Sequence, residues 1–181
     1  MQSERGPVSV ELLLDEATER AVRADWDALA DRGLSSLAAH VAPSNRPHVS
    51  LYSGTTLDRA IALHGAAVEI PFGIRLGPPI LFGAGPRRVL ARSVVPSAAL
   101  LGLHAAVVDQ VCARGVDVNV DDAADAAFLP GNWIPHVTIA RRVQVSSLEV
   151  ALGLLGPEVE GTVVGIRLWD SESRLATLLV G

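Results

Sequence analysis

Two histidines, His48 and His136, lie in near-identical segments of the chain, PHVSL and PHVTI. If each segment forms a β-strand, alternation of side chains puts His48 with Ser50 on one face, and His136 with Thr138. Two imidazoles can divide the roles of acid and base near neutrality, because a pKa of about 6.5 lets one be protonated while the other is neutral. The two hydroxyls can donate hydrogen bonds to phosphoryl oxygens. The repeated segment therefore predicts paired acid and base chemistry at a phosphate.

The elements that must position these histidines also repeat. Residues 8–95 and 88–180 are each predicted to run strand, helix, motif strand, helix, strand, strand. Asp15 and Ser97 are expected to cap the first helix of each repeat, and Gly33 and Gly115 to end it. The tetrapeptide Gly-Ile-Arg-Leu also follows each motif, at residues 73–76 and 165–168. These features indicate an internal duplication that covers nearly the whole chain.

The duplication predicts the fold class. Each repeat is too short to build its own core, so the two are expected to pack as lobes of one domain, residues 1–181, around a shared cleft. We predict an α+β fold with pseudo-twofold symmetry, in which largely antiparallel sheets line a central cleft and helices lie outside. Equivalent strands would then bring both histidines to the cleft.

Composition limits the classes of partner. The formal net charge of −5 has the wrong sign for coating long duplex nucleic acid, although local cations could hold a small anion. The single cysteine excludes an internal disulfide, which favours a reducing compartment. No apolar run is long enough for a membrane span. We therefore expect a cytoplasmic protein without a membrane partner, while its oligomeric state stays open.

The paired motifs resemble those of a known family. PHVS at 47–50 and PHVT at 135–138 look like the signature of the two-histidine (2H) phosphoesterase superfamily. Read on through Arg141, the second copy is similar to the Pro-His-x-Thr-Leu-Ala-Arg run of bacterial RNA 2′,3′-cyclic phosphodiesterases, also called 2′-5′ RNA ligases. Each motif follows a proline within a duplicated order of elements, which makes the resemblance specific.

The resemblance implies an activity and a site. It implies hydrolysis of a 2′,3′-cyclic phosphate or a 2′-5′ linkage, of RNA or a nucleotide, without a metal or other cofactor. His48 and His136 would be catalytic, and we favour His136 as the base and His48 as the acid. Ser50, Thr138 and Arg141 would bind the phosphate.

The alternation of side chains along each motif strand indicates further residues that could contact a substrate. Arg141 lies at an odd offset from His136, so a regular strand would point it away from the cleft and point Arg142 into it. The same rule puts Arg46 and Tyr52 on the face of His48. Arg46, Tyr52 and Arg142 are therefore predicted as possible substrate contacts.

Other readings stay open. The same fold could bind a nucleotide or an RNA end without turnover, and the sequence does not choose among an RNA end, a cyclic mononucleotide and an ADP-ribose cyclic phosphate. His40, His64 and His104 are expected to be packing or boundary residues, and Trp133 a core residue. Residues 117–121 have the first spacings of a calcium loop but lack its glycine and its glutamate, so we predict a solvated loop and no metal site.

Overall fold

A computed structural model of the protein describes residues 6–59, 63, 69–114 and 123–181. His64, Gly115 and the loop at residues 117–121 lie outside the described residues. Within the described residues, no helix is both long and apolar enough to cross a membrane.

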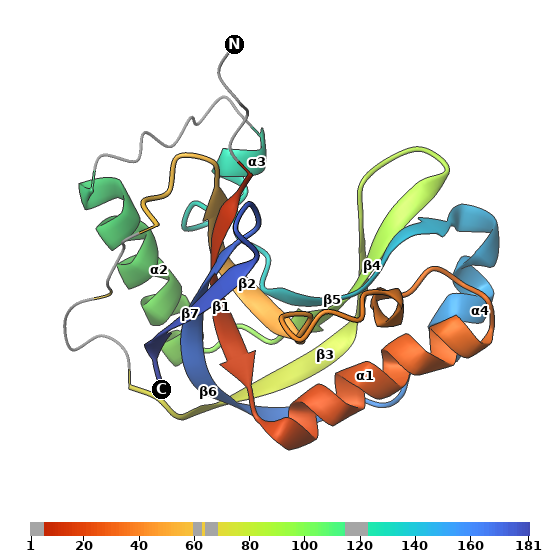
Figure 1. The fold of residues 1–181 in the computed structure, drawn as a ribbon. Coiled ribbons are helices and arrows are strands. Elements are labelled where there is room, and N and C mark those ends of the chain that lie inside the picture. Colours follow the sequence, from red (N-terminus) through yellow and green to blue (C-terminus); the bar gives the residue numbers. More distant parts are fainter. Residues whose placement is uncertain (1–5, 60–62, 64–68, 115–122) are drawn as a thin grey trace, which may run out of the picture.

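Seven strands form one sheet in which every pairing is antiparallel. The strands are β1 (Val8–Leu14), β2 (His48–Gly54), β3 (Phe72–Phe82), β4 (Arg87–Val94), β5 (His136–Gln144), β6 (Val159–Asp170) and β7 (Leu175–Val180). The order in the sheet is β1-β2-β5-β4-β3-β6-β7, and β1 also pairs with β6. Because β6 pairs with β3 near its start and with β1 and β7 further along, the sheet bends back on itself into a first lobe, which contains β1 and β2, and a second lobe, which contains β4 and β5 (Figure 1).

The two lobes share irregularities as well as strand order. The β1–β2 pairing skips Leu51, and the β4–β5 pairing skips Ile139, the equivalent residue of the second motif. A shift also occurs between β1 and β6 and between β4 and β3, near Leu14 and Val94. Matching bulges in both lobes confirm the predicted duplicated α+β fold.

The repeated tetrapeptide, in contrast, does not mark equivalent positions. Residues 165–168 of β6 pair with β1. Residues 73–76 of β3 pair with the start of β6, and only Leu76 also pairs with β4. The identity of the two Gly-Ile-Arg-Leu segments is therefore not structural equivalence.

The long helices begin where the sequence predicts. In α1 (Glu16–Asp31), the Asp15 carboxylate accepts from the amides of Ala17 and Thr18. In α2 (Ala98–Ala113), the Ser97 hydroxyl accepts from the amide of Leu100. Gly33 follows α1 with φ of 71°, a left-handed conformation that glycine adopts without steric cost. The shorter helices are η1 (Leu37–Ala39), α3 (Ala123–Ala126), η2 (Val145–Ser147) and α4 (Leu148–Gly153).

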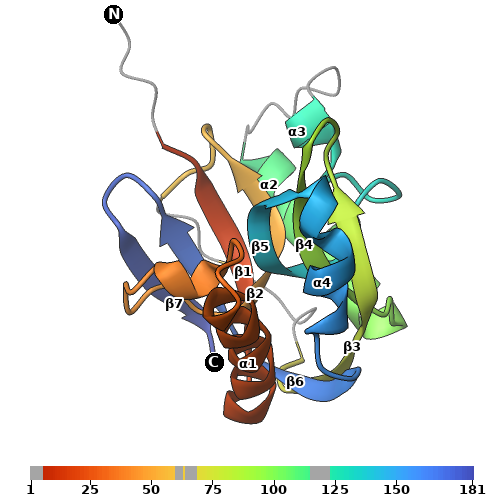
Figure 2. The ribbon, with the colours of Figure 1, turned by 90° about the vertical axis from the view of Figure 1, so that its right-hand side faces the viewer.

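Each long helix covers the motif strand of the other half. α1 contacts β5 and β6, while α2 contacts β2 (Figures 1 and 2). Trp26 of α1 donates from Nε1 to the carbonyl of Thr138 at 3.2 Å, and Trp133 donates to the carbonyl of Ser50 at 3.0 Å. Trp133 in turn stacks on His104 of α2, with ring centroids 3.9 Å apart. The exchange makes the two halves depend on each other for their cores.

A buried ion pair fixes α1 to the second lobe. Arg92 of β4 donates from Nε to Asp25 at 2.6 Å, and both side chains are at most 4% exposed. Asp25 also accepts from the amide of Gly156, and Arg92 donates to the Gly156 carbonyl. Because the charges are paired and hydrogen-bonded on both sides, removing one would leave the other uncompensated in the core.

Asp25→Ala should lower the free energy of unfolding by about 3–5 kcal/mol, as expected when one partner of a buried pair is removed. Arg20→Ala provides the control, because it breaks an ion pair with Glu16 whose side chains are 65% and 86% exposed. Its cost should stay within about 1 kcal/mol. Urea unfolding of wild type and of the two variants measures both free energies of unfolding. Equal losses in the two variants would show that the Asp25–Arg92 pair contributes no more than an exposed one.

Candidate active site

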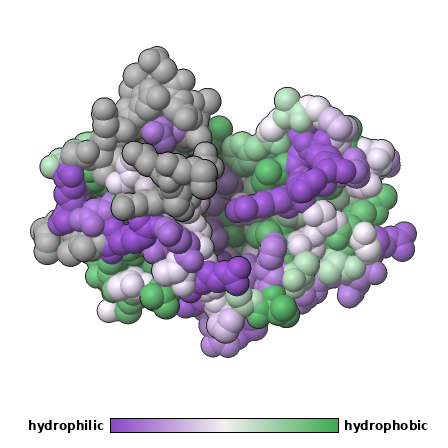
Figure 3. All heavy atoms as spheres, turned by 45° about the horizontal axis from the view of Figure 1, so that its top comes forward, coloured by the Kyte–Doolittle hydropathy of each residue, from purple (hydrophilic) through white to green (hydrophobic). Residues whose placement is uncertain are grey.

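The four polar side chains of the two motifs meet where the lobes join. β2 and β5 pair antiparallel through Val49 and Val137, which are 1% and 0% exposed. This register places His48 opposite Thr138 and Ser50 opposite His136. Because neighbouring side chains alternate, all four lie on the face away from the buried valines. The surface is hollowed between the lobes (Figure 3).

The two imidazoles lie on one diagonal of this patch and the two hydroxyls on the other. Diagonal neighbours across an antiparallel pair are about 7–8 Å apart at Cα. A phosphoryl group above the valine pair would therefore have an imidazole on each of two opposite sides. The hydroxyls of Ser50 and Thr138 would lie on the remaining two.

Each imidazole is oriented by a backbone carbonyl two residues upstream. Nδ1 of His48 lies 2.7 Å from the Arg46 carbonyl oxygen, and Nδ1 of His136 lies 2.7 Å from that of Ile134. A carbonyl can only accept, so Nδ1 donates in both rings. Nε2 of each ring is consequently the nitrogen left to exchange a proton with a substrate.

The environment of His136 favours its neutral form. Burial lowers its pKa below the usual 6.5, and the positive charges of His48 and Arg141 lower it further, while the bond to the Ile134 carbonyl opposes them. The Phe82 ring at the end of β3 packs against the imidazole, with centroids 4.5 Å apart. His136 is therefore suited to accept a proton at neutral pH.

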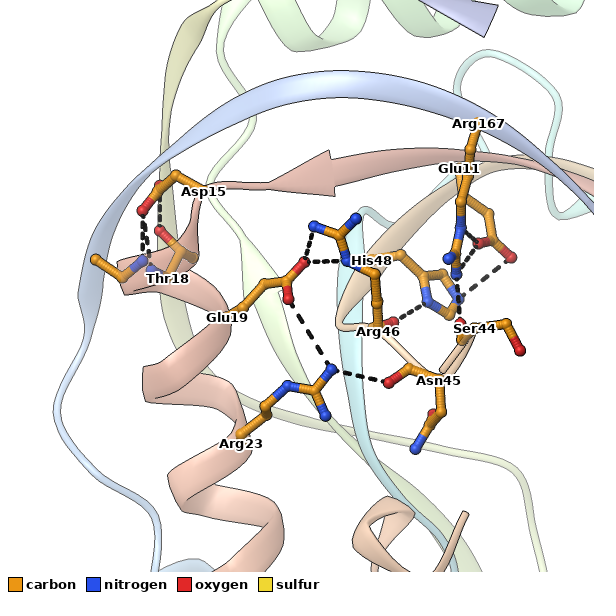
Figure 4. Close-up of polar contacts among 11 residues, drawn as sticks. Glu11, Asp15, Thr18, Glu19, Arg23, Ser44, Asn45, Arg46, His48 and Arg167 are labelled. Carbon is orange, nitrogen blue, oxygen red and sulfur yellow. Dashed lines mark hydrogen bonds and ion pairs between the residues drawn. The ribbon is translucent and has the colours of Figure 1, made fainter. Parts of the chain in front are cut away.

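His48 has a carboxylate beside it instead. Oε1 of Glu11 lies 3.5 Å from Nε2 of His48, a contact that is an ion pair when His48 is protonated. Glu11 is 3% exposed and accepts from Ser9 at 2.6 Å. It also pairs with Arg167 at 2.8 Å (Figure 4). The equivalent β4 residue is Ala91, because Glu11 pairs with Ser50 as Ala91 pairs with Thr138. The fold is nearly symmetric, but the chemistry of its two histidines is not.

Glu11 was not predicted as a site residue. In the sequence it is a single charge inside an apolar strand, between Val10 and Leu12. A charged residue inside an apolar strand is expected to be buried, and a buried charge needs a partner. This feature of Glu11 could have indicated that it pairs with other polar groups.

The charge of Arg141 is close enough to His136 to act on its pKa. Because the pairing skips Ile139, strand parity changes there: Ala140 is fully buried and Arg141 returns to the cleft face. The charge of Arg141 contributes to the lowered pKa of His136. Arg142 is exposed at a second irregularity with φ of 61°. Strand parity therefore does not extend past the bulge, and contact between Arg142 and a substrate stays a prediction.

The equivalent bulge in β2, at Leu51, overturns the prediction for Tyr52. Because the pairing skips Leu51, Tyr52 faces the core instead of sharing the face of His48, and it is 1% exposed. Its ring packs on Phe128, with centroids 5.6 Å apart. Burial raises the pKa of its hydroxyl to about 12. Tyr52 is thus a core residue and cannot stack on a substrate base.

Arg46 has a different role from the one that parity suggests. Its guanidinium pairs with Glu19 of α1 at 2.6 Å, and its carbonyl orients His48 (Figure 4). It also borders a cavity of about 590 Å³. Direct contact between Arg46 and a substrate stays a prediction.

The remaining candidates agree with their expected packing roles. His104 is 2% exposed, stacked on Trp133, and burial lowers its pKa. His40 directly follows η1. In the part of the chain that the structure describes, no group of three or more His, Cys, Asp or Glu side chains could hold a metal ion.

Comparison with known proteins agrees with this geometry. A solved structure described as the crystal structure of TT0787 of Thermus thermophilus is similar over 96% of this chain and 94% of that chain, with a TM-score of 0.59 and 20% identity, which shows a shared fold. No curated protein matches the chain in sequence. The model of the 2′-5′ RNA ligase superfamily matches residues 18–174, which include both histidine motifs. The protein therefore belongs to the 2′-5′ RNA ligase superfamily, as its two motifs suggested.

Proposed function

We propose that the protein is a metal-independent phosphodiesterase that hydrolyses a 2′,3′-cyclic phosphate or a 2′-5′ phosphodiester of RNA or a nucleotide. One observation carries the proposal: two imidazoles occupy one face at the β2–β5 contact, and each has Nδ1 bound to a carbonyl, which leaves Nε2 for the reaction. A family model that matches most of the chain supports a phosphoester as the substrate.

In the proposed reaction, His136 accepts a proton from water through Nε2 as the water oxygen bonds to phosphorus. The bond from phosphorus to a ribose oxygen breaks, and His48 donates the proton that this oxygen needs. Ser50, Thr138 and Arg141 hold the nonbridging oxygens, where negative charge develops. Proton exchange with solvent then restores both histidines.

The asymmetry of the site supports this division of roles. His136 has a lowered pKa, so it is neutral and able to accept a proton at pH 7. His48 has the Glu11 carboxylate 3.5 Å from Nε2, a contact that becomes an ion pair when His48 carries the proton to be donated. The positive charge of Arg141 near His136 would instead repel an imidazolium at His136. With the phosphoryl group above the valine pair, the diagonal arrangement would put the base and the acid on opposite sides of phosphorus, as in-line displacement requires.

His48→Ala and His136→Ala should each lower the turnover of a 2′,3′-cyclic phosphate by at least about 10²-fold, the lower range for one general acid or base. Because the two act as a unit, the double variant should lose much less than the product of the two losses. Ser50→Ala and Thr138→Ala should be milder, since each removes one hydrogen bond worth about 1.5–3 kcal/mol.

Steady-state kinetics of these variants separates catalysis from simple binding. Wild-type rates in both histidine variants would refute the enzyme. A wild type that binds nucleotides but turns over no cyclic phosphate would establish the alternative, a non-catalytic nucleotide- or RNA-end-binding module.

The pH dependence tests which histidine is the base. A base must be neutral, so kcat/KM should fall as pH drops through the pKa of His136, with this acid limb below pH 6.5. Arg141→Ala removes a positive charge that lowers this pKa, so the acid limb should move to higher pH. Arg142→Ala should move it less. An acid limb unchanged in Arg141→Ala would show that Arg141 does not act on the base.

Hydrolysis should continue unchanged in excess chelator, because the proposed mechanism assigns every proton transfer and every charge contact to side chains. Rates with and without EDTA, followed by re-addition of Mg²⁺, Mn²⁺ or Zn²⁺, provide the measurement. Activity that disappears with EDTA and returns with one of these ions would replace this mechanism with a metal-assisted one.

A further inference from the structure

A pocket of about 370 Å³ opens beside His48, on the first lobe. Its floor is the cleft face of β1 and β6, and its wall is formed by residues 40–45 after η1. Its lining includes Glu11, His48, Arg167, Trp169, Ser171 and Arg174. Of these residues, only His48 takes part directly in the proposed reaction. The pocket is therefore free to hold the part of the substrate beyond the reacting phosphate.

Hydrogen bonds hold the wall of the pocket in place. The side-chain amide of Asn45 donates from Nδ2 to the carbonyls of Leu37 and His40, at 2.9 and 2.7 Å. Arg23 of α1 donates to the Asn45 carbonyl, and Arg167 of β6 donates to the Ser44 carbonyl (Figure 4). The wall is thus tied to two different elements of the fold, and the pocket is formed before a ligand arrives.

Trp169 supplies an aromatic surface in this pocket. It pairs with Ser9 as Arg167 pairs with Glu11, so its side chain lies on the same face as the Glu11 carboxylate that contacts His48. It is only partly buried. An indole open to a pocket beside a phosphate site is suited to stack on a nucleobase.

The arginines of the pocket differ in whether their charge is already neutralised. Arg167 is 5% exposed and pairs with Glu11. Arg174, in the turn between β6 and β7, is exposed and forms no ion pair with any residue that the structure describes. It lines both this pocket and the adjoining cavity of about 590 Å³. Its guanidinium is therefore available to an anion.

We propose that this pocket binds the nucleoside of the substrate, with its base stacked on Trp169, and that Arg174 binds a second phosphate on the 5′ side of that nucleoside. The inference rests on the proposed function, because the reacting phosphate must lie at His48 and His136. It predicts a preference for substrates that carry a 5′-phosphate over those that carry a cyclic phosphate alone.

The test compares adenosine 2′,3′-cyclic phosphate with its 5′-phosphorylated form. Wild type should have a KM about tenfold lower for the 5′-phosphorylated substrate, because a charged hydrogen-bonded pair is added. Arg174→Ala should lose this preference and keep its KM for the unphosphorylated substrate, while Arg174→Lys should retain part of it. Arg20→Ala, which removes an exposed arginine on α1, should keep the full preference.

Trp169 is tested with the same substrates. Trp169→Ala should raise KM for both by about tenfold, within the range measured for loss of one stacked base, with little change in kcat. Trp169→Phe should restore most of the affinity, which a purely structural role of the indole would not predict. Unchanged KM in Trp169→Ala would refute the stacking site.

The outcomes separate this inference from the proposed function. If wild type hydrolyses both substrates and prefers neither, the phosphate subsite is wrong and the function stands. If wild type hydrolyses neither, nor any member of a panel of 2′,3′-cyclic phosphates and 2′-5′ linked nucleotides, the function is wrong, and calorimetric titration tests the subsite alone. Wild type should then bind adenosine 3′,5′-bisphosphate more tightly than adenosine 3′-phosphate, and Arg174→Ala should not. Equal binding of the two ligands by wild type would overturn the subsite.

Discussion

The antiparallel contact between Val49 and Val137 is the constraint on which the site depends. Because both valines are buried, their neighbours must face the other way, so one packing requirement directs four polar side chains to one surface. The exchange of helices enforces it: α1 packs behind β5 and α2 behind β2, and Trp26 and Trp133 bind carbonyls of the motif strands. The core and the proposed site are therefore stabilised by the same contacts.

Duplication supplies two equivalent histidines, but acid–base catalysis needs them to differ. The fold distinguishes them through residues that are not repeated. Glu11 lies beside His48 where the second lobe has Ala91, and Arg141 lies near His136. The pocket at Trp169 and Arg174 also adjoins His48. A symmetric backbone thus carries an unsymmetric electrostatic environment, which gives the proposed reaction its direction.

The motifs, the helix caps and the order of the strands and the two long helices could be predicted from the sequence because they depend on local patterns. The helix predicted after the first motif strand lies largely outside the described residues. Predictions from strand parity failed at the bulges. Leu51 and Ile139 are each skipped by the pairing, so Tyr52 moves into the core and Arg141 moves to the cleft. A bulge depends on the partner strand, and no local pattern reveals it. The role of Glu11 was missed for a related reason, since its partners Arg167 and His48 are distant in sequence.

A crystal structure of the protein with a ribonucleoside vanadate, which mimics the five-coordinate transition state, would show whether the two histidines flank the reacting phosphorus. We expect vanadium above the Val49–Val137 pair, with Nε2 of His48 and Nε2 of His136 each about 2.6–3.2 Å from a different apical oxygen. Ser50 and Thr138 should donate to equatorial oxygens. Vanadate bound elsewhere, or in contact with one imidazole alone, would contradict catalysis by a pair of histidines.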